Sequence, residues 1–227
     1  MLRDGTVTSW LANSLFGWNE YRERRDGGQG VTLDLAASDI QIAKGNTGND
    51  LFNAANATWN VSLVGGGGND SLIGGHGNDT LTGGDGDDTL VAGTGKDILN
   101  GGKGTNHYAI THGQDTIIND NSVPANSEVD YDAGIAPLNL VFSQAGNNLK
   151  VSVHNTTDQV TISNWFNGTA SQVDMFQAGN GQHLLNNQVQ QLIQAMASFT
   201  TQTGLTWDQA IAQRPQDVQT ILAANWQ

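Results

Sequence analysis

The chain has 227 residues, a formal net charge of −13, 29 glycines and no cysteine. The missing cysteines exclude disulfides and thiolate metal sites, and the negative charge disfavours nucleic acid and anionic membranes as partners. No stretch approaches the roughly 20 apolar residues of a transmembrane helix, and the N-terminal residues lack the apolar core of a secretory signal peptide. We therefore expect a soluble protein that is exported, if at all, without an N-terminal signal.

The first 30 residues carry little pattern. Val7, Leu11, Leu15 and Trp18 have the spacing of a short helix, so residues 1–30 are expected to form a lead-in of helix and loop. Residues 31–42, VTLDLAASDIQI, then alternate in polarity. This alternation predicts strands that lead into the next segment.

Five consecutive nine-residue repeats run from Gly65 to Ala109, with the form G-G-x-G-x-D-x-U-x, in which U is apolar. The first three repeats match every consensus position, the fourth has Ala92 for the first glycine, and the fifth has Asn106 in place of aspartate. Weaker copies occupy residues 45–53 and 110–118. The spacing between residues 53 and 65 indicates one irregular turn with a two-residue insertion.

The nine-residue spacing predicts a parallel β-roll. Only x-U-x can form a strand, with U pointing inward, and the six residues before it must reverse the chain with glycines at positive φ. Two repeats make one coil, so each repeat stacks on the second repeat after it. The expected stacked pairs are Asp50 with Asp70, Asp70 with Asp88, Asp79 with Asp97, Asp97 with Asp115, and Asp88 with Asn106. The expected core residues are Leu72, Leu81, Leu90, Leu99, Tyr108 and Ile117.

Stacked turns bring aspartate carboxylates and backbone carbonyl oxygens to one point. An all-oxygen arrangement suits Ca²⁺, which takes six to eight such ligands, and the binding energy of the ion becomes folding energy. We expect several calcium ions, a weaker site where Asp88 faces Asn106, and a largely disordered segment without calcium. The candidate metal residues are Asp50, Gly65, Gly66, Gly67, Gly68, Asp70, Gly74, Gly75, His76, Gly77, Asp79, Gly83, Gly84, Asp85, Gly86, Asp88, Gly93, Gly95, Asp97, Gly102, Gly104, Asn106 and Asp115.

Other chemistry finds little support in the residues. The side chains of His76 and His112 stand at the variable third turn position and are expected to face solvent. A transition-metal site at His107 and His112, which flank a strand, is the alternative. Neither H-E-x-x-H nor G-x-S-x-G occurs, so we expect neither a zinc protease nor a lipase, and a non-catalytic chain.

With these repeats the chain resembles the C-terminal part of RTX (haemolysin-type calcium-binding) proteins. The resemblance extends past the repeats, through VDYDAGI, LNLVFSQAGNNLKVSV, DQVTISNWFNG and QVDMF between residues 129 and 176. It implies a bacterial protein that is exported by type I secretion and folds on calcium outside the cell. It also implies that the last residues carry a signal read by the secretion channel; packing of the same residues on the cap as helices is an equal and compatible alternative.

The expected fold is therefore mainly all-β. A parallel β-roll over residues 31–120 is followed by a β cap over 121–185 and a helical C-terminal segment over 186–227. Alternation predicts cap strands at residues 138–142, 149–153, 160–165 and 173–176. Helical spacing predicts one helix after Asn187 as N-cap, a second opened by Thr206 and Gln209, and a third starting at Pro215.

Two functions of different classes are consistent with the sequence. The first is a calcium-dependent folding and export module at the C-terminal end of a larger toxin, adhesin or secreted enzyme. The second is a recognition module, in which the calcium-ordered roll or its cap binds a glycan or a host surface.

Overall fold

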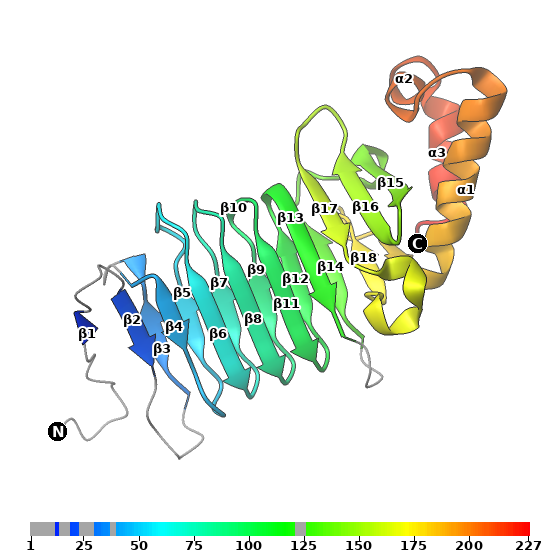
Figure 1. Ribbon diagram of the computed structural model, residues 1–227. Coiled ribbons are helices and arrows are strands. Elements are labelled where there is room, and N and C mark those ends of the chain that lie inside the picture. Colours follow the sequence, from blue (N-terminus) through cyan, green and yellow to red (C-terminus); the bar gives the residue numbers. More distant parts are fainter. Residues whose placement is uncertain (1–11, 14–18, 23–29, 37–39, 121–125) are drawn as a thin grey trace.

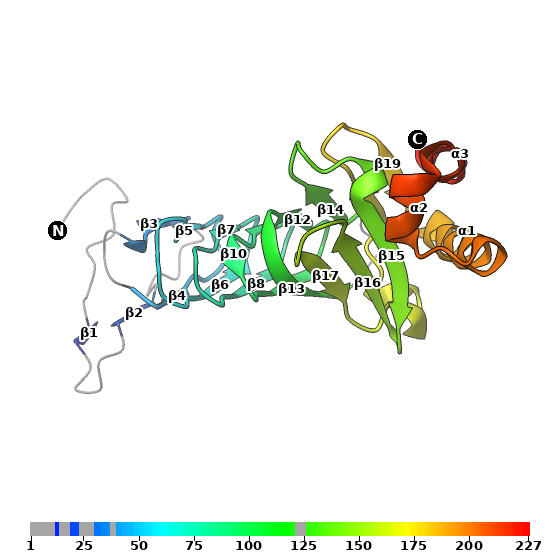
Figure 2. The same ribbon diagram turned by 90° about the horizontal axis from the view of Figure 1, so that it is seen from above.

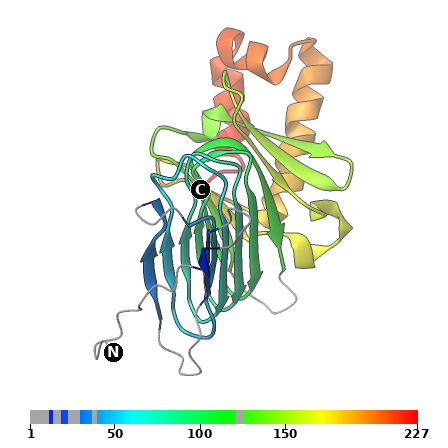
Figure 3. The same cartoon turned by 60° about the vertical axis from the view of Figure 1, so that its left-hand side comes forward.

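The computed structural model describes residues 12–13, 19–22, 30–36, 40–120 and 126–227. Within these ranges the chain forms a β-solenoid of two facing sheets, closed at one end by antiparallel strands and three helices (Figure 1). Figure 2 shows the two sheets as separate layers, and Figure 3 shows the coils of the roll one behind another. The expected β-roll is confirmed.

The first sheet follows the order β1-β2-β4-β6-β8-β11-β13-β17-β16-β15, with β10 also paired to β13. In that order its strands are β1 (Ala12–Asn13), β2 (Asn19–Arg22), β4 (Ile42–Lys44), β6 (Ser62–Gly67), β8 (Thr80–Asp85), β11 (Ile98–Lys103), β13 (His112–Asn119), β17 (Gln159–Ile162), β16 (Asn148–Val153) and β15 (Leu140–Ala145), and β10 is Thr94–Gly95.

The second sheet follows the order β19-β18-β14-β12-β9-β7-β5-β3. Its strands, in that order, are β19 (His183–Leu185), β18 (Met175–Gln177), β14 (Glu128–Tyr131), β12 (His107–Ile110), β9 (Thr89–Val91), β7 (Ser71–Ile73), β5 (Leu51–Asn53) and β3 (Thr32–Asp34).

The strands of the roll pair in parallel with the register that a two-repeat coil requires. In the first sheet Leu63, Leu81, Leu99 and Ile117 lie side by side, and in the second Phe52, Leu72, Leu90 and Tyr108 do so. All of these side chains are fully buried. The expected thin core is thus present, and each coil contributes one apolar residue from each sheet.

The strands of the first sheet are longer than the three residues predicted. Strands β6, β8 and β11 each have six residues because the first glycines of the next turn continue the pairing. Gly66 pairs with Gly84, and Gly84 with Gly102. A Cβ on Gly84, where φ is +127°, would lie 1.9 Å from the carbonyl oxygen of Gly66. Glycine is needed here because two backbones approach at a φ that other residues rarely adopt.

The irregular turn between β5 and β6 lies where the insertion predicts it. Ala54 and Ala57 are buried in it, and the amide of Ala57 donates to the carbonyl of Ala54 at 2.8 Å. Val61 occupies the position that aspartate holds in the regular repeats, two residues before the inward Leu63. This turn therefore keeps the shape of a repeat but lacks its carboxylate.

The cap consists of β15, β16 and β17, which extend the first sheet, and β18 and β19, which extend the second. Within the cap the neighbouring strands pair antiparallel: β15 with β16, β16 with β17, and β18 with β19. Its strands differ from the predicted ranges. Residues 137–139 form a 3₁₀ turn before β15, and β17 ends at Ile162, before a second 3₁₀ turn over 165–167. The aromatic rings of Phe142 and Phe176 meet at 5.3 Å, and Trp165 packs on Phe176 at 5.7 Å. This apolar cluster gives the cap a core of its own.

Three helices cover the far side of the cap: α1 (Asn186–Thr203), α2 (Trp207–Gln213) and α3 (Pro215–Ala223). Helix α2 has the predicted capping box between Thr206 and Gln209, whereas the prediction of Asn187 as N-cap of α1 is wrong. That helix begins at Asn186 with Leu185 as its N-cap, two residues before the predicted cap, and the Gln188 side chain accepts from the backbone amide of Leu185 at 3.0 Å. None of the described helices has both the length and the apolar character that crossing a membrane requires.

The N-terminal lead-in is described only at residue 30 and at β1 and β2, which are short antiparallel strands and not helix. Strand β2 also pairs in parallel with β4 and therefore belongs to the first sheet. Val7, Leu11, Leu15 and Trp18, on which the helix was predicted, lie outside the described residues.

Candidate metal centre

The aspartates at repeat position six form a hydrogen-bonded ladder along one edge of the roll. The amide of Asp50 donates to Oδ1 of Asp70 at 2.7 Å, and that of Asp70 to Oδ1 of Asp88 at 2.8 Å. The amide of Asp88 donates to Oδ1 of Asn106 at 3.2 Å. Each side chain therefore reaches back to the preceding coil, and the stacked pairs are the predicted ones.

The opposite edge carries a second ladder of the same kind. Val61 donates its amide to Oδ1 of Asp79 at 2.8 Å, Asp79 to Asp97 at 2.7 Å, and Asp97 to Asp115 at 3.1 Å. One carboxylate oxygen of each aspartate thus holds two coils in register. The other carboxylate oxygen, Oδ2, takes no part in these bonds between coils.

The second carboxylate oxygen is buried and has no hydrogen-bond partner in the described part of the chain at five aspartates. These are Asp50, Asp70, Asp88, Asp97 and Asp115, and their side chains are at most 3% exposed. Asp79 differs because its Oδ2 accepts the amide of Gly75 at 2.7 Å. A buried carboxylate oxygen without a partner is costly. Its repetition at five equivalent positions indicates a site for a cation.

Burial raises the pKa of these carboxyls. The pKa of Asp70 and that of Asp115 rise from 3.8 to about 7, with the charges of neighbouring ladder aspartates adding to the effect of burial. The pKa of Asp88 and that of Asp97 rise to about 6 for the same leading cause. Without a cation, these groups are therefore held between the charged and the neutral form near neutral pH.

At two repeats, a backbone carbonyl oxygen and a free carboxylate oxygen meet beside the first glycine. A Cβ on Gly83 would lie 2.2 Å from Oδ2 of Asp88 and 2.6 Å from the carbonyl oxygen of Gly101 in the stacked repeat. At Gly45 the same position lies 1.8 Å from Oδ2 of Asp50 and 2.4 Å from the Gly65 carbonyl oxygen. Carboxylate and carbonyl oxygens of successive coils thus converge, which is the donor set that Ca²⁺ prefers.

Asn106 closes the first ladder without needing an ion. Its side-chain amide nitrogen donates to the carbonyl oxygens of Gly102 and Gly104, at 3.2 and 3.3 Å. The hydroxyl of Tyr108 accepts from the amide of Gly101 at 3.2 Å and donates to Oδ1 of Asn119 at 2.8 Å. Hydrogen bonds therefore satisfy oxygens in the turn where the aspartate is missing, which gives a physical reason for the weaker site predicted there.

The cap continues both edges of the roll with residues that sequence reasoning missed. On the first edge, Asn106 donates its amide to the hydroxyl of Ser127 at 3.0 Å, and Ser127 donates its amide to Oδ2 of Asp174 at 3.0 Å. On the second edge, Asp158 accepts the amide of Gly113 at 3.1 Å and its other oxygen meets Nδ1 of His112 at 3.0 Å. Neither Asp158 nor Asp174 belongs to a repeat, so no periodicity could have identified them.

Outside the aspartate ladders, each edge also carries an outer ladder, formed by residues at repeat position five, which the consensus leaves undefined. Oδ1 of Asn49 accepts the amide of Asn69 at 2.8 Å, and Oδ1 of Asn69 accepts the amide of Asp87 at 3.0 Å. On the other edge, Asn60 accepts from Asn78 at 2.8 Å and Asn78 from Lys96 at 2.9 Å. The signal for it was present in the repeated N-D dipeptides, which place an Asn acceptor beside three of the six ladder aspartates, Asp50, Asp70 and Asp79.

The remaining predicted residues divide into turn backbone and exposed side chains. Positive φ occurs at repeat positions two and four, at Gly66, Gly68, Gly84, Gly86, Gly93, Gly95, Gly102 and Gly104. Gly65, Gly67, Gly74, Gly75, Gly77 and Gly83 complete the turns. The side chain of His76 contacts Oγ1 of Thr94 at 3.2 Å, and that of Asp85 pairs with Lys103 at 3.2 Å. The side chains of His76 and Asp85 therefore point away from the aspartate ladders, and only their backbone belongs to the turns.

Comparison with known families agrees with this geometry. Residues 62–90 and 77–108 match the family described as RTX calcium-binding nonapeptide repeat (4 copies). Residues 148–181, in the cap, match the family described as haemolysin-type calcium binding protein related domain. No curated protein sequence matches the chain. The chain thus carries RTX repeats folded as a β-roll, repeats whose aspartate ladder implies Ca²⁺ binding and which are typical of secreted bacterial proteins.

Proposed function

We propose that this chain is a non-catalytic module that folds when it binds several calcium ions, after export by a type I secretion system. In this proposal it forms the C-terminal part of a larger toxin, adhesin or secreted enzyme. The observation that carries the proposal is the set of five buried carboxylate oxygens without partners. They make the ion-free roll costly and the calcium-bound roll favourable.

In this proposal, calcium supplies the positive charge and the binding partner that the buried carboxylate oxygens lack. The ion would bind the free carboxylate oxygens and the nearby carbonyl oxygens of two successive coils, so its binding energy would become folding energy. In a cell interior poor in calcium the chain would stay unfolded and competent for export. Outside, calcium above a Kd of roughly 10⁻⁴–10⁻³ M, which is typical of extracellular modules, would order it.

The C-terminal helices are proposed to carry the export signal in the unfolded chain. After folding, the same residues pack on the cap: Trp226 is buried, with its ring 6.2 Å from that of Phe142. The backbone of Gln227 also exchanges two hydrogen bonds with that of His183 on β19, both at 2.9 Å. Burial of a signal on folding would favour release of the chain from the export channel once calcium is bound.

A calcium titration of the whole chain tests the proposal. We expect weak β signal in circular dichroism without calcium and a cooperative rise as calcium is added, with no glycan present. Full β structure in the calcium-free chain at neutral pH would show that the ion is not needed for folding. Ordering that requires an added glycan would instead favour a recognition module.

A matched pair of variants tests which carboxylates hold the ions. Asp88→Asn keeps an oxygen that can accept the amide of Asp70 but removes a ladder charge. Asp87→Asn removes the same charge one residue away, from the outer ladder, and keeps the acceptor for the amide of Thr105. We expect Asp88→Asn to raise the calcium concentration at the folding midpoint about tenfold or more, because ligand charge tunes calcium affinity. Equal shifts in the two variants would contradict the assignment.

A further inference from the structure

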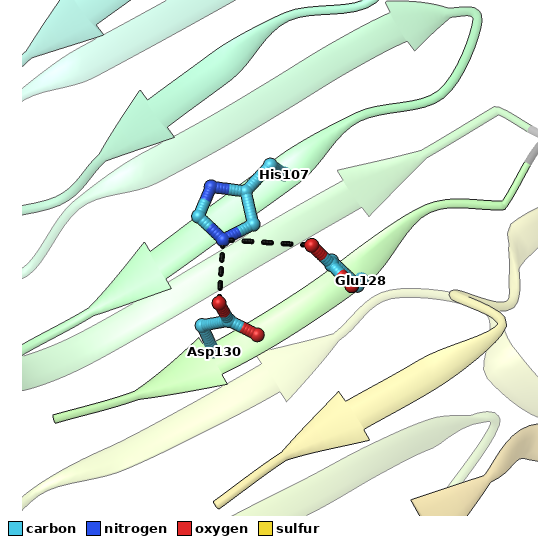
Figure 4. A group of neighbouring side chains, drawn as sticks. All are labelled: His107, Glu128 and Asp130. Carbon is cyan, nitrogen blue, oxygen red and sulfur yellow. Dashed lines mark hydrogen bonds and ion pairs between the residues drawn. The ribbon is translucent and has the colours of Figure 1, made fainter. Parts of the chain in front are cut away.

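A cluster of three side chains lies on the outer face of the second sheet, away from the ladders. His107 stands on β12, and Glu128 and Asp130 stand on the neighbouring β14 (Figure 4). The parallel register sets His107 beside Glu128, with Asp130 two residues further along. Tyr108, which follows His107, and its partner Val129, between Glu128 and Asp130, point inward and are fully buried. The alternation of the strands therefore gathers one imidazole and two carboxylates on one side of the sheet.

The three side chains point toward a common centre. Nε2 of His107 lies 2.7 Å from Oδ2 of Asp130 and 3.7 Å from Oε1 of Glu128. All three atoms lie within 4.8 Å of one another. A tetrahedral Zn²⁺ with bonds of about 2.0–2.2 Å would hold its ligand atoms roughly 3.3–3.5 Å apart. The observed distances bracket this value, so small side-chain rotations suffice to form such a site.

The charges and burial of the cluster favour a cation over a simple ion pair. One imidazole, even when protonated, cannot balance two carboxylates. The second oxygen of Asp130, Oδ1, is shielded from solvent and has no hydrogen-bond partner in the parts of the chain that the structure describes. The three side chains are 24–33% exposed. An ion could therefore enter from solvent and keep a water molecule as its fourth ligand.

We propose that His107, Glu128 and Asp130 form a binding site for a divalent transition metal ion, separate from the calcium ladders. An imidazole nitrogen with two carboxylate oxygens suits Zn²⁺ or its neighbours in the first transition row, whereas Ca²⁺ prefers oxygen ligands alone. The site joins β12, the last strand that the repeats contribute to the second sheet, to β14, which pairs with strand β18 of the cap. A bound ion would thus tie the roll to its cap.

The test uses the full chain saturated with calcium and titrates Zn²⁺ by calorimetry, with Co²⁺ absorption as a reporter of ligand geometry. We expect one tight Zn²⁺ per chain. His107→Gln and Asp130→Asn should each weaken it at least about tenfold, since even the loss of a supporting group around a metal site commonly costs 10–100-fold. His154→Gln is the matched control, because that imidazole also pairs with one carboxylate, of Asp208, but with no second one in the part of the chain that the structure describes.

The outcomes separate the proposal from its alternatives. Calcium-dependent circular dichroism of each variant establishes that it still folds. If the folded His107→Gln and Asp130→Asn variants bind Zn²⁺ as tightly as the unmodified chain, the ion binds elsewhere and the proposal is wrong. If the unmodified chain binds no Zn²⁺, the cluster is only an ion pair. Loss of the tight site in both variants, with His154→Gln unaffected, supports the assignment.

Discussion

Protons should partly replace calcium in this fold. The ladder aspartates have raised pKa values in the ion-free fold, and 3.8 is their ordinary value. Below that value a carboxyl is neutral in both the folded and the unfolded chain, so its burial carries no charge penalty. As the pH rises through the folded pKa, the carboxyl must ionise while buried, and the ion-free fold loses stability.

The magnitude follows from the pKa shifts. A rise from 3.8 to about 7 at Asp70 corresponds to ~4 kcal/mol lost by the ion-free fold at a pH above 7, at ~1.4 kcal/mol per unit. Asp115 has the same shift, and the two together cost ~8 kcal/mol. This is comparable with the ~5–15 kcal/mol that stabilises a typical protein. The ion-free roll should therefore be largely unfolded at neutral pH and regain structure as the pH falls toward about 5.

Denaturant titrations of calcium-stripped protein at about pH 5 and about pH 8 measure this effect, because the pH slope of stability reports the difference in bound protons. The ion-free chain should be more stable at the lower pH. With saturating calcium the slope should reverse, because protons then compete with the ion for the same oxygens. Asp115→Asn removes one titrating group while its amide oxygen can still accept from Asp97, and should flatten the ion-free slope. Ion-free stability that increases with pH would refute the reasoning.

Three further predictions concern single residues. Gly84→Ala should destabilise the calcium-loaded roll by more than ~1–3 kcal/mol in thermal melts, because φ is +127° there and the new Cβ meets the Gly66 carbonyl; Gly134→Ala, in open space, should change little. Asn106→Asp should add one calcium ion to the stoichiometry measured by calorimetry, and weaken the ion-free fold by losing two hydrogen bonds. Trp226→Ala should cost ~3–5 kcal/mol by emptying a buried site in the cap, without altering calcium stoichiometry.

The roll was predictable from sequence because its contacts repeat. Once the nine-residue frame is known, the partner of Asp70 must be the residue 18 positions later, and the structure has that contact. The inward leucines follow from the same arithmetic. The starts of α2 and α3 were predictable for a different reason. The capping box needs only Thr206 and Gln209, three positions apart, and Pro215 favours the first helical position by itself.

The parts that sequence did not predict depend on contacts between segments with no shared period. Asp158 and Asp174 lie in the cap, 45 and 47 residues from the backbone amides they accept. The cluster at His107 depends on the register between β12 and β14, which pairs His107 with Glu128. These residues are 21 positions apart, so the nine-residue repeat does not predict their pairing. The start of α1 was misplaced because a Gln188 side chain, and not a typical capping residue, satisfies the first amide.

The aspartates at repeat position six, the inner ladders, and the residues at position five, the outer ladders, both link successive coils, but in different ways. The inner ladder reaches back one coil and carries buried charge, whereas the outer ladder reaches forward and is built mainly from neutral Asn side chains exposed to solvent. Its five bonds from Asn49, Asn60, Asn69, Asn78 and Asp87 are worth about 1 kcal/mol each. Together they offset the burial of about one inner carboxylate. The outer ladder can therefore fix the register of the coils, but a cation must balance the remaining buried charge before the roll is stable.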